Sequence, residues 1–65
     1  MDTSPVRPPG ADVVGRRVSV RHRTPDGSAS DVVGRLLAAG PVLRLERRDG
    51  SVATVEAATV IIWRL

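Results

Sequence analysis

The chain has 65 residues, 42% of them hydrophobic, and its ten arginines and seven acidic residues give a net charge of +3. This length allows one domain, and the absence of cysteine excludes disulfides and thiolate metal sites. No apolar run approaches the roughly 20 residues that a membrane-spanning helix needs, and residues 1–5 lack the charged start and apolar centre of a signal peptide. We therefore expect a cytoplasmic protein without membrane contact.

The N-terminal residues 1–11 differ in composition from the rest of the chain. They contain Pro5, Pro8, Pro9 and Gly10 and almost no apolar side chains. A segment of this kind cannot bury enough apolar surface to offset the entropy lost on ordering. The composition therefore predicts a flexible leader over residues 1–11 and one folded domain over residues 12–65.

The first strand is expected over residues 14–23. Successive side chains of a strand point to opposite faces, which places Val18, Val20 and His22 together. The opposite face carries the basic side chains of the segment, which are Arg17, Arg21 and Arg23. The segment therefore predicts a half-buried strand with a basic outer face and with His22 on the inner side or the rim of the core.

The remaining chain alternates short apolar runs with turn signals. Residues 24–28 and 48–51 both contain Asp-Gly, which tolerates the positive φ angles of tight turns. The runs between these signals predict strands over residues 31–38, 42–47, 52–55 and 60–65, and residues 56–59 suit a single 3₁₀ turn. Residues 31–38 also fit a helix, but the short length, the Val-Val pair and Gly34 favour a strand. Glycine inside a strand indicates a bulge, a bend or the close approach of another backbone.

Five short strands in this order predict an all-β fold, a small five-stranded SH3-like barrel with one 3₁₀ turn before the last strand. Closure into a barrel removes the free sheet edges that are a liability for so small a β protein. An open sheet or an OB-type barrel is the alternative, although the chain has no residues for the helix that OB barrels place between strands three and four. The expected core consists of Val18, Val20, Val32, Leu36, Leu43, Leu45, Val55, Val60 and Ile62.

Several segments resemble a known module. They are GRRVSVRHR at 15–23, DVVGRLL at 31–37, RRDG at 47–50, VATV at 52–55 and VEAATV at 55–60. Together they resemble the SH3-like N-terminal domain of actinobacterial GNAT-type acetyltransferases, over about three-quarters of the chain. The resemblance implies an accessory domain beside a separate catalytic domain that uses acetyl-CoA.

The residues that acetyl transfer or other catalysis would need are missing from the sequence. No Gly-x-Gly spacing opens a helix that could hold the pyrophosphate of acetyl-CoA. His22 is the only histidine, so no histidine pair can bind zinc, and no serine or carboxylate at a fixed spacing would make it a general base. We therefore expect no catalytic residues, no cofactor and no metal, and predict that the isolated chain is not an enzyme.

The arginines of the expected outer face suggest two functions. Arginine suits phosphate through its forked donors, so Arg17, Arg21, Arg23 and Arg35 are candidate contacts for nucleic acid. Nucleic-acid platforms normally add exposed aromatics for base stacking, and Trp63 is the only aromatic residue. The alternative is a solvated or protein-facing surface.

The favoured hypothesis is a non-catalytic accessory domain that interacts with a protein. Its partner would be a catalytic domain, another protein or a second copy of the chain. The candidate docking residues are Leu37, Ile61 and Trp63, which the strand alternation places away from the expected core. The second hypothesis is a nucleic-acid-binding module that uses the arginine face of the first strands.

Overall fold

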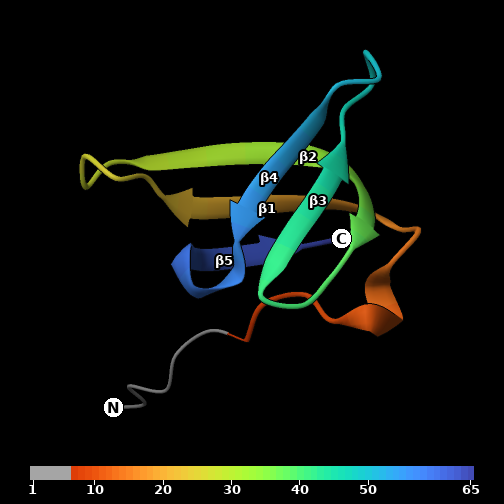
Figure 1. Ribbon diagram of the computed structural model, residues 1–65, viewed down its shortest axis with the longest axis horizontal. Helices are drawn as coiled ribbons and strands as arrows, with labels where there is room; N and C mark the ends of the chain where they lie inside the picture. The colour runs from red at the N-terminus through yellow and green to blue at the C-terminus, as the bar shows by residue number, and fades with distance from the viewer. Residues whose placement is uncertain (1–6) are drawn as a thin grey trace.

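The computed structural model describes residues 7–65, which form five antiparallel strands in one sheet (Figure 1). The strands lie in the order β4-β3-β2-β1-β5. Their bounds are β1 Arg17–Arg23, β2 Ala29–Ala38, β3 Val42–Glu46, β4 Val52–Glu56 and β5 Val60–Arg64, with 3₁₀ turns η1 at Ala11–Val13 and η2 at Ala57–Thr59. The predicted all-β SH3-like fold, with a 3₁₀ turn before the last strand, is confirmed. The turn η1 was not predicted.

The core lies between the β3–β4 hairpin and the inner side of β1, β2 and β5, over which the hairpin crosses (Figure 1). Of the predicted core residues, all but Val60 and Ile62 are buried. Val13 and Ala53 join them, and Val60 is half-buried against the cluster. Alternation of one buried and one exposed residue along β1, β2, β3 and β4 therefore follows the period of two that the sequence shows.

The strand β5 departs from that pattern because its pairing with β1 contains a bulge. Trp63 pairs with Val20 and Ile62 pairs with Arg21, but the next pair joins Val60 to His22, so Ile61 is left over. One extra residue moves the following side chains to the other face of the sheet. The prediction that Ile62 is a core residue was therefore wrong, because its side chain is 57% exposed.

Gly34 lies where β2 passes from one partner strand to the next. The strand pairs with β1 over Ala29–Arg35 and with β3 over Arg35–Ala38. A Cβ atom added to Gly34 would lie 2.5 Å from the carbonyl oxygen of Glu46. Of the three explanations that the sequence suggested for this glycine, the structure shows the close approach of another backbone. The glycine lies where β2 changes its pairing from β1 to β3.

The β1–β2 and β3–β4 turns are each held by hydrogen bonds to an aspartate carboxylate. In the β1–β2 turn the Asp26 carboxylate accepts hydrogen bonds from the Thr24 hydroxyl and from the Ser28 amide, the latter at 3.0 Å. In the β3–β4 turn the Asp49 carboxylate accepts from the Ser51 hydroxyl at 2.7 Å and from its amide at 2.9 Å. The following glycines, Gly27 and Gly50, both have φ of 89°.

These hydrogen bonds favour the charged form of each carboxylate. The bond from the Thr24 hydroxyl, followed by that from Ser28, lowers the pKa of Asp26 below 3.8. The bonds from Ser51, first from its hydroxyl and then from its amide, lower the pKa of Asp49 below the same value. Both turns are therefore stabilised by ionised aspartates.

The described part of the N-terminal segment lies against the barrel. Pro9 is fully buried, and the indole Nε1 of Trp63 donates a hydrogen bond of 2.6 Å to the carbonyl oxygen of Arg7. Residues 1–6 of the predicted leader lie outside the described residues. The flexibility of residues 1–11 and the domain boundary at residue 12 stay predictions.

Candidate functional site

The side of β2, β1 and β5 that points away from the core carries most of the basic side chains of these strands. We call it the arginine face and define it by Arg17, Arg21, Arg23, Arg35 and Arg64 together with Asp31, all of them exposed. Cross-strand partners share a face, and the register pairs Arg17 with Arg35 and Arg21 with Asp31. Arg64 joins them because it pairs with Ser19. Five guanidinium groups therefore face solvent with one carboxylate among them.

The structure brings the four predicted arginines to one face but gives them different partners. Arg21 forms an ion pair with Asp31, with 3.2 Å between Nε and the carboxylate, and it is the only ion pair within residues 7–65. Arg23 donates a hydrogen bond of 3.0 Å to the carbonyl oxygen of Gly27. These two side chains are therefore held by their own neighbours.

Arg17 and Arg35 are placed differently, because each has the other directly across the β1–β2 ladder. Like charges in that position destabilise a sheet. Glu46 on β3 is the register partner of Arg35 on its other side, where the sheet bends, but it forms no ion pair within the described residues. An anion bound here would relieve the repulsion.

Sequence reasoning missed Arg64. Counting the alternation forward from Val60 places Ile62 and Arg64 on the inner side, whereas the bulge at Ile61 reverses that phase. Trp63 was the available signal, since a large aromatic side chain gains most from burial. Counting outward from a buried Trp63 places Ile62 and Arg64 on the outer face, as observed.

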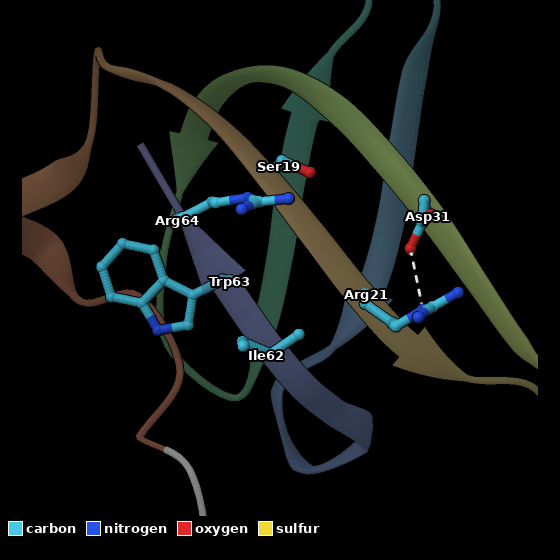
Figure 2. Close-up of a pocket in the computed structure, with 6 residues that line it drawn as sticks. All are labelled: Ser19, Arg21, Asp31, Ile62, Trp63 and Arg64. Atoms are coloured by element: carbon cyan, nitrogen blue, oxygen red, sulfur yellow. Dashed lines mark ion pairs between the residues drawn. The ribbon is translucent and has the colours of Figure 1, made fainter.

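A hollow of about 300 Å³ opens on this face between β1 and β5 (Figure 2). It is lined by Ser19, Arg21, Asp31, Ile62, Trp63 and Arg64. Figure 2 shows the side chain of Arg64 extending across β1 toward Ser19, and that of Arg21 pointing toward Asp31, while the indole of Trp63 points away from Arg21. The hollow therefore combines two guanidinium groups, a carboxylate paired with one of them, a hydroxyl and an apolar wall.

The predicted docking residues do not form one patch. Leu37 is 39% exposed and lies past Arg35 on β2, at the opposite end of the β1 pairing from Ile61. Ile61 and Trp63 are both half-buried, and Trp63 packs against the core. The exposed apolar side chains near the hollow are instead Ile62 and Val33. A docking role for Leu37, Ile61 and Trp63 stays a prediction.

A second hollow, of about 480 Å³, lies where the end of β1 meets β4 and η2. Its lining includes His22, which is half-buried at the rim as expected, and Glu56. Within residues 7–65, no group of three or more histidines, cysteines or carboxylates is placed to hold a metal ion. None of the helical turns in that range has the length or hydropathy to cross a membrane.

Comparisons with known proteins identify the family. A probable histone acetyltransferase of Mycobacterium tuberculosis, Rv0428c, is 38% identical over 55 residues, which is 80% of this chain but only 18% of that protein. No solved structure matches the chain. The family model of the Rv0428c N-terminal Sm-like domain matches residues 8–64. The predicted resemblance to the N-terminal domain of an actinobacterial acetyltransferase is confirmed, and the chain belongs to the family of the Rv0428c N-terminal Sm-like domain.

Proposed function

We propose that this domain is a non-catalytic accessory module of an acetyltransferase and that it docks a protein partner. The probable histone acetyltransferase of Mycobacterium tuberculosis is more than five times longer than the stretch of it that this chain matches. The observation that carries the proposal is the arginine face, on which five guanidinium groups surround the exposed side chains of Val33 and Ile62. Arginine beside apolar groups is a common composition of protein interfaces.

The surroundings of His22 support a non-catalytic role. A general base needs a partner that orients it and a substrate position within hydrogen-bond reach. Within residues 7–65 the His22 side chain has no hydrogen bond, and the nearby Thr59 hydroxyl instead donates to the backbone carbonyl of Glu56 at 2.6 Å. This hollow therefore offers no oriented acid–base pair.

The test is complementation in trans. The Mycobacterium tuberculosis relative, shortened by the residues that this chain matches, is mixed with the 65-residue chain. Sedimentation should show a complex of the two, and the chain alone should not transfer acetyl groups from acetyl-CoA. Acetyl transfer by the chain alone, or no complex at any salt concentration, would overturn the proposal.

Nucleic acid is the second candidate ligand, and the opposed pair of Arg17 and Arg35 favours it. Two arginines directly across a strand ladder present two sets of forked donors, which suit phosphate oxygens. Binding of this kind weakens steeply with salt because it releases counterions. A fluorescence titration with short RNA and DNA at low salt that shows no binding would eliminate this candidate.

A further inference from the structure

We propose that the hollow between β1 and β5 binds a carboxylate side chain from an acidic segment of a partner protein. Arg64 and Arg21 supply the cationic contacts, and Ser19 supplies a hydroxyl donor. The inference rests on the proposed function, since it names the chemistry of the partner that the accessory module docks. It also turns a general basic surface into one site with a defined centre.

The first argument is placement. Ser19 and Arg64 are register partners across the β1–β5 ladder, and Arg21 follows two residues later on the same face of β1. Ser19 and Arg21 project from the interior of β1 and Arg64 from the last residue of β5, so strand pairing sets the spacing of all three. Ser19 is half-buried, and its hydroxyl has no hydrogen bond within the described residues. A donor in this position is available to a ligand.

The second argument is charge. Asp31 contacts Arg21 through Nε. This contact leaves the terminal N–H donors of the guanidinium for a ligand, since arginine has five donors in a fixed fork. Arg64 forms no ion pair within residues 7–65. Two cations and one carboxylate leave the hollow short of one negative charge. A single incoming carboxylate would balance it.

The third argument is the apolar wall, which favours protein over nucleic acid. Ile62 is 57% exposed beside the charged groups, where the methylenes of a glutamate side chain would cover it. Base stacking needs an exposed aromatic face. Trp63 is the only aromatic residue of the chain, and it is half-buried with its Nε1 bonded to Arg7. The hollow therefore offers contacts for a carboxylate with an aliphatic stem and no platform for a base.

The experiment uses Trp63, which lines the hollow and is the only tryptophan, as an intrinsic reporter. A short glutamate peptide is titrated into the 65-residue chain, with a glutamine peptide and a short oligothymidylate as the other arms. The glutamate peptide should give a saturable change in Trp63 emission that weakens with salt. The glutamine peptide should give none.

Three variants locate the binding. Arg64→Glu should weaken glutamate binding at least about tenfold, because it removes a charged contact and adds repulsion. Arg48→Glu makes the same change of charge on the exposed β3–β4 turn, so its effect should stay within roughly twofold. Ser19→Ala should weaken binding by about threefold through loss of one hydrogen bond. Thermal unfolding of each variant checks that it is folded.

The outcomes separate this proposal from the function on which it rests. Equal losses in Arg64→Glu and Arg48→Glu, tighter binding of oligothymidylate than of glutamate, or no response to glutamate would each overturn the carboxylate site. If Arg64→Glu still forms the complex with the shortened acetyltransferase as tightly as the parent chain, the site is wrong while the accessory function stands. If the glutamate peptide binds and the acetyltransferase does not, the site stands and the accessory function is wrong.

Discussion

The two strands that flank β1 pair with it in different ways. On one side, β2 keeps an unbroken register with β1 over seven pairs, from Arg17 with Arg35 to Arg23 with Ala29. On the other side, β5 pairs with the same strand through a bulge that leaves Ile61 without a partner. Alternation in the sequence therefore predicts the exposed face of β2 correctly, and it predicts that of β5 correctly at Val60 but in reverse beyond the bulge at Ile61. The difference teaches that a period of two assigns faces only where the ladder is continuous.

The largest expected effect is on β2, at the point where its continuous ladder with β1 gives way to pairing with β3. Gly34→Ala places a Cβ atom 2.5 Å from the Glu46 carbonyl oxygen, a backbone atom that cannot move aside without opening the β2–β3 pairing. We expect a loss of about 3 kcal/mol in the free energy of unfolding, at the upper end for overpacking, measured by urea denaturation.

The control for Gly34→Ala is the neighbouring Val33→Ala, at an exposed position of the same strand. Its cost should stay near about 0.5 kcal/mol, as for other surface substitutions. Similar costs at the two positions would show that β3 does not approach Gly34 as closely as the structure has it.

The reversed phase of β5 predicts the next effect. Trp63→Ala removes a half-buried side chain that packs against the core and bonds to Arg7, so it should cost about 2 kcal/mol, less than for a fully buried tryptophan. Ile62→Ala, at the exposed neighbour, should cost about 0.5 kcal/mol. Circular dichroism during urea denaturation measures both without needing the tryptophan signal. If Ile62→Ala lowered the free energy of unfolding more than Trp63→Ala, Ile62 would be the core residue and β5 would have no bulge.

A smaller effect of opposite sign is expected on the β2 side. Arg17→Glu replaces two like charges directly across the ladder by an opposite pair with Arg35, which should raise the free energy of unfolding by about 0.5 kcal/mol. The same change should weaken binding of an acidic partner. A variant that is less stable than the parent chain at low salt would mean that the opposed arginines do not repel.

The smallest expected effect is a loss of stability at low pH. Acid should weaken the two hairpin turns before it weakens the β1–β5 pairing. The pKa values of Asp26 and Asp49 are lowered in the folded state by hydrogen bonds in the two turns. Their stabilisation is therefore complete above about pH 4, the range in which the unfolded carboxyls titrate, and it is lost as pH falls through the lower folded pKa values. No such aspartate lies in η2, the turn that leads into β5.

Thermal midpoints measured on descending pH should fall in the parent chain. They should fall less in a double variant with Asp26→Asn and Asp49→Asn, which has less stabilisation to lose. An equal decrease in both proteins would assign the acid sensitivity to other carboxyls.

Much of the fold could be predicted because its signals are local. Asp-Gly pairs mark both hairpin turns, and apolar alternation marks β1, β3 and β4. Gly34 suggested a bulge, a bend or a close approach of another backbone, and the structure shows the close approach. These features depend on a few neighbouring residues, so they can be predicted from the sequence.

The remainder depended on long-range packing. Val13 joins the core through the turn η1, and Pro9 is buried, although both lie in or beside a segment whose composition suggests a leader. The bulge at Ile61 is set by the pairing of β5 with a strand about forty residues earlier, and it moved Arg64 to the candidate site. The strand alternation counted from Val60 does not show this register shift, and the expected burial of Trp63 was its one local signal. Three of the four arginines on β1 and β5 were therefore placed correctly and Arg64 was not.

The bond between Trp63 and Arg7 has a mechanical consequence. It anchors the described N-terminal segment to the strand that holds the C-terminal residues, so both attachment points lie on the same strand of the sheet. Tension between residues 7 and 65 therefore passes first through this one hydrogen bond and the last residues of β5, and not through the rest of the sheet. Under a pulling force the Trp63–Arg7 bond should break before any two strands separate.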